Sequence, residues 1–148
     1  MSPFRLSFIT VIVGLFGLTA TAIAHSGATG IVKDRMDGFS RSKDNMKAIR
    51  GHLAEEDLQA VVPLAREIRD WATTIPDYFP EGSDGSPSEA APEIWTDFDG
   101  FKAAAEANYA AADDLALASN SGDPDAAIAA FKATAASCKS CHRTYRLD

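Results

Sequence analysis

Two cysteines and a histidine lie together near the end of the chain, in the order Cys138-Lys139-Ser140-Cys141-His142. Residues three apart lie on the same face of a helix, so both thiols can form thioether bonds to the two vinyl groups of one haem. His142 follows directly and can place its imidazole on the iron as the axial ligand. A Cys-x-x-Cys-His run is typical of c-type haem attachment. The motif therefore predicts one covalently attached haem c.

Two other kinds of chemistry use a closely spaced pair of cysteines. A thioredoxin-like disulfide lies at a helix start within a βαβ pattern, and no such pattern is visible in this sequence. A zinc site needs further ligands, but the only other histidines are His25 and His52, and there is no third cysteine. Haem attachment is thus the favoured interpretation.

The first 24 residues have the pattern of a secretory signal peptide. Arg5 precedes an apolar run, and the segment closes with small residues at Ala22 and Ala24. A retained membrane anchor is the alternative, since the apolar run is nearly long enough to span a bilayer. The small-residue end favours cleavage, which leaves residues 25–148 as one periplasmic domain without a stable membrane anchor. Export agrees with the motif, because haem attachment takes place on the oxidising side of a bacterial membrane.

The chain is acidic, with 21 Asp and Glu against 14 Lys and Arg. The predicted mature part is more acidic still, because the signal peptide contains one arginine and no acid. A negative surface disfavours nucleic acid and anionic membranes as partners. It suits redox partner proteins with basic patches, although solubility alone explains it equally well.

Apolar residues recur at steps of three and four along four segments of the chain. This periodicity is typical of amphipathic helices. We expect helices over residues 29–50, 55–74, 93–119 and 124–145. Prolines and glycines crowd residues 76–92, so this connection should pack on the helix ends or be mobile.

Local signals predict where these helices begin and end. Thr29 is expected to cap the first helix, and Gly51 suits its end. Pro63 is expected to kink or divide the second helix, since proline removes a backbone donor and clashes with the preceding turn. Asp123 followed by Pro124 is a well-formed start for the last helix.

The stripe of the last helix includes both cysteines of the motif. It steps by fours and threes through Ala127, Phe131, Thr134, Cys138, Cys141 and Tyr145. The third helix has a similar seam, with polar residues at Asn108 and Ser119. The sequence therefore predicts an all-α, antiparallel up-down-up-down four-helix bundle with one covalently bound haem in its core.

The whole predicted mature chain resembles cytochrome c′ and its low-spin relatives. The strongest part is the C-terminal run from Cys138 to Arg146, because few other c-type cytochromes carry the haem motif at the very C-terminus. Weaker support comes from Gly30-Ile31-Val32-Lys33-Asp34-Arg35-Met36-Asp37, Tyr78-Phe79-Pro80 and Pro92-Glu93-Ile94-Trp95.

This resemblance implies roles around the haem. Arg35 would approach a haem propionate, and Phe39, four residues later, would lie over the iron. Phenylalanine has no lone pair to give, so a five-coordinate iron open to NO or CO is expected. Met36 on nearly the same face is the alternative sixth ligand, which would make a low-spin electron carrier. Core packing is its other explanation.

On the proximal side, the resemblance places Arg146 where a basic residue can influence ligand exchange. A solvated charge at the helix end explains Arg146 equally well. Tyr145 is expected to pack beside the haem.

The expected function is that of a periplasmic monohaem cytochrome that carries single electrons, binds NO or CO, or does both. A haem enzyme, either a peroxidase or an NO reductase, is the alternative from another class. It needs a distal acid–base group, for which Phe39 and Met36 are poor candidates, so an enzyme is not expected. Homodimers are frequent in the family, and the resemblance leaves that state open.

Overall fold

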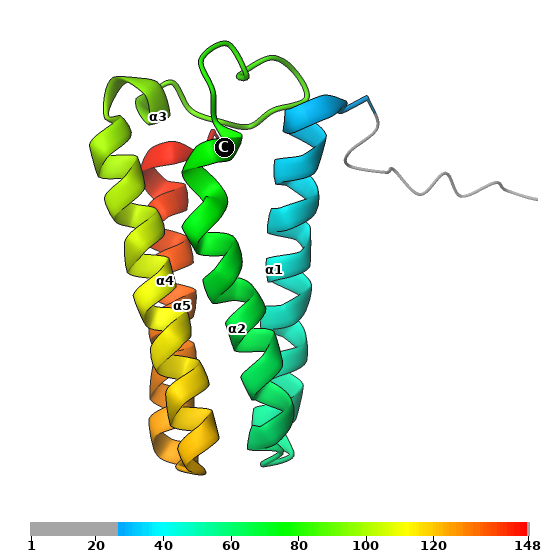
Figure 1. The fold of residues 1–148 in the computed structure, drawn as a ribbon, viewed down its shortest axis with the longest axis vertical. Coiled ribbons are helices and arrows are strands. Elements are labelled where there is room, and N and C mark those ends of the chain that lie inside the picture. Colours follow the sequence, from blue (N-terminus) through cyan, green and yellow to red (C-terminus); the bar gives the residue numbers. More distant parts are fainter. Residues whose placement is uncertain (1–26, 148) are drawn as a thin grey trace, which may run out of the picture.

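The computed structural model describes residues 27–147 as an antiparallel four-helix bundle (Figure 1). The predicted signal peptide, residues 1–24, and His25 lie outside the described residues. The long helices are α1 Gly30–Ala54, α2 Leu58–Thr74, α4 Phe98–Ser121 and α5 Pro124–Tyr145, and two short helices, η1 Ile75–Tyr78 and α3 Glu93–Thr96, flank the long connection. Within residues 27–147 no helix is both long and apolar enough to pass through a lipid bilayer.

Helix α1 starts where the sequence predicts and runs farther than expected. Thr29 is at the N-cap position, although its side chain makes no capping hydrogen bond. The helix continues through Gly51 to Ala54, so the expected end at Gly51 was wrong. A glycine costs at most about 1 kcal/mol inside a helix. Leu53 packs against the core just beyond it, and this burial favours the extra turn.

Helix α2 begins at Leu58, three residues later than expected, because Asp57 caps it. The Asp57 carboxylate accepts a hydrogen bond from the Ala60 backbone N–H at 3.2 Å. Pro63 lies inside α2 without dividing it, so that part of the prediction was wrong. Pro63 is exposed, whereas Val61 and Val62 before it are buried. Packing on the core side therefore keeps the helix continuous although Pro63 lacks a backbone N–H.

The expected third helix is broken at Asp97. Its backbone (φ −131°, ψ 55°) leaves the helical region and ends α3. Its carboxylate then caps α4 by accepting from the Gly100 N–H at 3.2 Å. A single helix over 93–119 was therefore wrong, because an aspartate in this position competes for the backbone as an N-cap. The last helix matches its prediction, with Asp123 accepting from the Ala126 N–H at 3.0 Å and Pro124 in the first turn.

Two buried clusters divide the bundle along its length. An aliphatic cluster comprises Ile49, Val61, Ala65, Ile68, Ala112, Leu115 and Ala116. An aromatic cluster at the other end comprises Ala72, Ile75, Phe79, Ala90, Ile94, Phe101, Ala105 and Tyr145. Helix α2 packs extensively against α1 and α4, and α4 against α5, whereas α1 and α5 have little contact.

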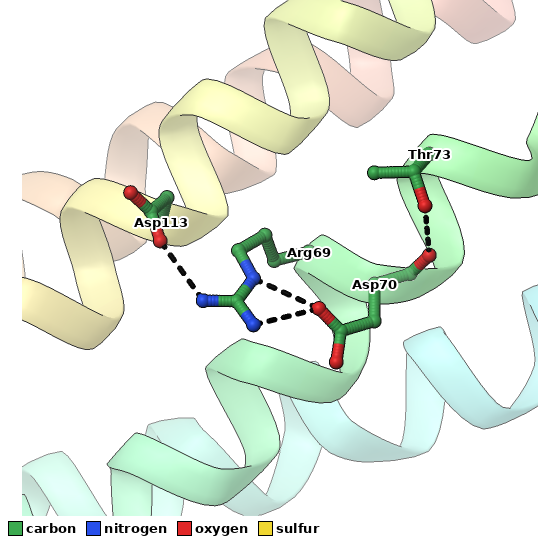
Figure 2. A network of polar contacts seen from close by, with 4 residues as sticks. All are labelled: Arg69, Asp70, Thr73 and Asp113. Atoms are coloured by element: carbon green, nitrogen blue, oxygen red, sulfur yellow. Dashed lines mark hydrogen bonds and ion pairs between the residues drawn. The ribbon is translucent and has the colours of Figure 1, made fainter.

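Polar contacts also join α2 to α4 on the outside of the bundle. Arg69 of α2 donates to Asp113 of α4 at 3.1 Å and to its neighbour Asp70 (Figure 2). These side chains are partly exposed, so the pair contributes modestly to stability.

The long connection covers the aromatic end of the bundle. Phe79, Ala90 and Ala91 are buried in it. Two backbone hydrogen bonds join it to the end of α5, from the Ala91 N–H to the Tyr145 carbonyl (3.1 Å) and from the Leu147 N–H to the Glu89 carbonyl (2.9 Å). The connection therefore packs on the helix ends, one of the two expected behaviours.

Candidate haem site

Helix α5 carries the three motif residues in its last two turns. Cys138 and Cys141 are free thiols and both are half-buried, so they face the bundle as the stripe predicts. The Cys138 sulfur accepts a hydrogen bond from Asn108 of α4 at 3.4 Å. Cys141 packs against the aromatic cluster instead. His142 is more exposed and lies on the surface side of the helix.

Burial is the main influence on the charge states of these groups. Burial raises the pKa of the Cys138 thiol, and burial followed by repulsion from Cys138 raises the pKa of Cys141 to about 11. Both are therefore protonated thiols at neutral pH. Partial burial and then the Arg146 charge lower the pKa of His142, while Glu89 acts in the opposite direction. The neutral imidazole, which is the form that binds iron, is thus favoured.

Phe39 of α1 reaches the same end of the bundle as Cys141. Its half-buried ring meets Trp71 edge-on at a centroid distance of 5.5 Å and Phe79 at 6.3 Å. Both Phe39 and Cys141 pack against the aromatic cluster. The structure therefore brings the predicted distal residue and one predicted thioether residue to a common apolar centre. Met36 is half-buried and belongs to neither buried cluster.

Arg35 is almost completely buried, at 2% exposure, and binds the long connection. Its guanidinium donates to the Tyr78 carbonyl at 3.1 Å, to the hydroxyl and carbonyl of Ser83, and to the Ser88 hydroxyl at 2.6 Å. It also lies over the Phe79 ring, 4.4 Å from the centroid. These contacts occupy four of its five N–H groups, which leaves one N–H free, within the described residues, to donate to another group. The approach of Arg35 to a haem propionate stays a prediction.

No carboxylate forms an ion pair with Arg35 within residues 27–147. Burial lowers the pKa of the Arg35 guanidinium, and the charge of Asp84 partly offsets this. Arginine nevertheless stays protonated in proteins. A buried positive charge that has no carboxylate ion-pair partner among the described residues is compatible with the predicted approach of an anionic propionate.

The residues after the motif are fixed by the connection and by α4. Tyr145 is 8% exposed, stacks edge-on with Phe101 at 5.3 Å and donates its hydroxyl proton to Asp97 at 2.9 Å. Arg146 pairs with Glu89, with Nε 2.8 Å from the carboxylate. Lys139, His142, Arg143, Arg146 and Leu147 together line a shallow surface hollow. The predicted proximal roles of Tyr145 and Arg146 stay predictions.

The residues present fit a c-type haem. Two unpaired thiols one helical turn apart and an adjacent neutral imidazole form the donor set. Helices α1 and α5, which carry the predicted distal and proximal residues, have little contact and leave Phe39 and Cys141 half-covered. The buried Trp71 indole N–H also lacks an acceptor in the described part of the chain. By contrast, residues 27–147 contain no cluster of three His, Cys, Asp or Glu side chains arranged to hold a metal ion directly.

Sequence reasoning missed several residues around this site. Trp71 was not singled out, although its ring touches Phe39 and Tyr78. Asn108 is predicted from the sequence only as a polar residue in the seam of the third helix, whereas in the structure it contacts Cys138. Glu89 was not singled out, and it pairs with Arg146. The usable signal was the concentration of aromatic residues around the long connection, which marks one end of the bundle as different from the other.

Comparison with known proteins agrees with this geometry. A family model described as "Cytochrome C′" matches residues 30–146. A cytochrome c′ of Rhodospirillum rubrum is 34% identical over 93% of this chain and 97% of its own length. A cytochrome c-556 of Agrobacterium fabrum is 37% identical over 90% of both chains. A crystal structure of cytochrome c′ from Thermochromatium tepidum is similar with a TM-score of 0.73, at 27% identity over 80% of this chain and 95% of that one.

Proposed function

The chain belongs to the cytochrome c′ family, and we propose that Cys138 and Cys141 bind its single haem covalently while His142 ligates the iron. As a c-type cytochrome of the c′ type, the protein binds haem. When bound, the haem supplies an iron that changes its charge by one electron and can accept a small ligand. We further propose that this iron is five-coordinate, with Phe39 over the sixth position.

The packing of Phe39 is the observation that carries this proposal. Two edge-on ring contacts, with Trp71 and Phe79, hold the side chain against the aromatic cluster. Such pairs stabilise by about 0.5–1.5 kcal/mol each beyond area burial, so the ring has a preferred place. An apolar ring there offers no electron pair to iron and excludes water. With this ring over the iron, the site would admit only small diatomic molecules such as NO and CO.

Met36 is the competing ligand, and its position supports it less. Its side chain is half-buried but lies outside the aromatic cluster that Phe39 and Cys141 share. Ligation by Met36 would require α1 to rotate about its axis. Such a rotation would displace Phe39 from Trp71 and move Arg35 away from the connection.

Similar proteins bind a diatomic gas. A solved nitric oxide complex of a cytochrome c prime variant from Alcaligenes xylosoxidans is similar to this chain, with a TM-score of 0.72 and 26% identity over 80% of this chain and 94% of that one. We propose NO or CO binding, single-electron exchange with redox partner proteins, or both, as the function of this chain. No pair of groups placed for acid–base catalysis is part of the proposal, so the protein is not proposed as an enzyme.

The proposal extends to the cellular location of the protein, its partners and its oligomeric state. Residues 1–24 act as a signal peptide, and the mature protein works in the periplasm, where thioether attachment takes place. Its negative charge suits basic redox partners. A homodimer is also proposed, because a similar cytochrome c′ structure describes a ligand-controlled dimer dissociation.

Absorption spectroscopy of the purified holoprotein tests the coordination. We expect a reduced spectrum of the high-spin type, and an oxidised spectrum without the long-wavelength charge-transfer band of methionine-ligated haem. Phe39→Met should convert the spectrum toward the low-spin type, because a thioether then lies where the ring lay. Phe39→Leu is the matched control and should stay high-spin.

Met36→Leu separates the two candidates for the sixth position. It should leave the spectrum unchanged if Phe39 covers the iron. A low-spin wild-type spectrum that becomes high-spin in Met36→Leu would overturn the five-coordinate proposal and assign the ligand to Met36.

A further inference from the structure

Asn108 is a buried polar residue of α4 that points at the haem motif. The residue is only 8% exposed, and its side chain extends from α4 to contact α5. The amide nitrogen lies 3.0 Å from the Ser137 hydroxyl and 3.4 Å from the Cys138 sulfur. A buried amide requires partners, because leaving one unsatisfied costs about 1–3 kcal/mol. Here both partners are consecutive residues of α5, and one of them is a thiol of the motif.

The hydrogen bonds around Ser137 decide which end of the amide faces Cys138. A serine hydroxyl has one hydrogen, and that of Ser137 is donated to the Thr134 carbonyl at 2.8 Å. The Ser137 oxygen can therefore only accept from Asn108. The NH₂ group of Asn108 thus faces Ser137 and Cys138, and its carbonyl oxygen points away. Thr134 is fully buried, and its hydroxyl hydrogen lies between the Ala111 and Ala130 carbonyls at 3.0 and 2.9 Å, so packing and this shared hydrogen bond fix the residue to which Ser137 donates.

A donor facing the sulfur is compatible with both chemical states of Cys138. Thioether formation adds the S–H bond across a vinyl group. The sulfur bonds to one vinyl carbon, the hydrogen goes to the other, and no oxidant or reductant is needed. The sulfur keeps its lone pairs but loses its hydrogen. It can therefore accept from Asn108 before and after the reaction, whereas it can donate only before it.

We propose that Asn108 is a positioning residue for haem attachment, which orients the Cys138 sulfur for thioether formation and remains hydrogen-bonded to the thioether. This inference rests on the proposed covalent attachment through Cys138. The two cysteines then differ in how they are held. A polar contact from α4 fixes Cys138, while apolar packing against the aromatic cluster fixes Cys141.

Asn108→Asp is the sharpest test, because it keeps the shape of the side chain and removes the donor. A carboxylate can accept a hydrogen from the free Cys138 thiol but receives nothing from a thioether, so it favours the unattached state. Ser137→Ala removes the acceptor that orients the amide, and should act in the same direction with a smaller effect. Ser119→Ala is the matched control, since Ser119 is another buried polar residue of α4 and its hydroxyl has no hydrogen-bond partner among the described residues.

The measurement is made on chains that carry haem. Each variant is expressed with its signal peptide, denatured, alkylated with iodoacetamide and analysed by peptide mass spectrometry. We expect the ratio of free Cys138 to free Cys141 on haem-bearing chains to rise about fivefold in Asn108→Asp, the change expected for one lost hydrogen bond. Ser119→Ala should keep the wild-type ratio. One unsaturated vinyl group in the Asn108→Asp product should also shift the haemochrome band to longer wavelength.

The ratio distinguishes positioning from general destabilisation. Loss of folding exposes both cysteines together and lowers total haem content without raising the ratio. If the wild type retains its haem and the ratio of free Cys138 to free Cys141 is unchanged in Asn108→Asp, the positioning role is overturned. The proposed function is then left intact. Release of haem from the wild type by acid–acetone extraction would overturn covalent attachment itself.

Discussion

At the scale of single residues, the place of Phe39 depends on the glycine before it. A Cβ atom added to Gly38 would lie 2.5 Å from Cζ2 of Trp71, far closer than van der Waals contact. The missing side chain thus allows the Trp71 ring to lie against the α1 backbone. From there the ring meets Phe39 edge-on. The residue proposed over the iron is therefore positioned by packing that no chemical motif reveals.

Gly38→Ala should destabilise the protein although alanine is the better helix former. The propensity gain is about 1 kcal/mol. The clash is with a rigid ring and should cost about 3 kcal/mol, the upper end of the usual range for overpacking, so the net loss is about 2 kcal/mol. Urea unfolding measures the difference. Gly51→Ala in the same helix has no atom within 4 Å of the added Cβ and should stabilise by about 0.5–1 kcal/mol. Equal stabilisation by both substitutions would show that Trp71 does not press against Gly38.

At the scale of elements, Asp97 joins the start of α4 to the end of α5. Its carboxylate caps α4 through the Gly100 N–H and accepts the hydroxyl proton of Tyr145. Gly100 permits this, because an added Cβ would lie 2.5 Å from the Tyr145 oxygen. The break between α3 and α4 thus serves to hold Tyr145, three residues after the proposed iron ligand His142.

Asp97→Ala should cost more than the loss of a cap alone. A cap contributes about 1 kcal/mol, and the hydrogen bond to Tyr145 about another 1 kcal/mol. Asp123→Ala is the matched control, because Asp123 caps α5 and makes no second side-chain contact within residues 27–147. We expect Asp97→Ala to destabilise by about twice as much in urea unfolding. In a double-mutant cycle, Tyr145→Phe should add little to Asp97→Ala; full additivity would show that the two side chains do not interact.

The sequence predicts the number of long helices, their direction and the Asp123–Pro124 start of α5, because these depend on local spacing and caps. It predicts the haem motif for the same reason. It does not predict the break at Asp97, since an aspartate on a long apolar stripe is compatible with an unbroken helix until its tertiary partner, Tyr145, is known. The contacts of Trp71 with Phe39, of Arg35 with the connection and of Asn108 with α5 likewise join residues at least 29 positions apart. Periodicity carries no information about such pairs.

At the scale of the whole molecule, the long connection links α1 and α5, two helices that have little direct contact with each other. Arg35 of α1 donates to the Ser88 hydroxyl, and the next residue, Glu89, pairs with Arg146 beyond α5. The same stretch forms backbone hydrogen bonds with Tyr145 and Leu147. Helices α1 and α5, on which the proposed distal and proximal residues lie, are therefore joined at one end of the bundle through consecutive residues of the connection (Figure 1).

Arg35→Met should loosen this end of the molecule while the rest of the bundle stays closed. Methionine keeps an apolar contact over Phe79 but makes none of the hydrogen bonds to the connection. Native-state hydrogen exchange should show faster exchange of the Ala91 and Leu147 amides, by about tenfold or more for a loss of 1–2 kcal/mol in local stability. Amides in the middle of α4 should exchange as in the wild type.

Arg69→Met provides the comparison, because Arg69 also joins two elements through its guanidinium, but does so between α2 and α4 (Figure 2). It should leave the exchange of Ala91 and Leu147 unchanged. If Arg35→Met slows or preserves exchange at these amides, the connection is held by its own buried residues, Phe79 and Ala91, and Arg35 does not join α1 to α5. If exchange rises in every helix alike, Arg35 stabilises the bundle as a whole instead of one end of it.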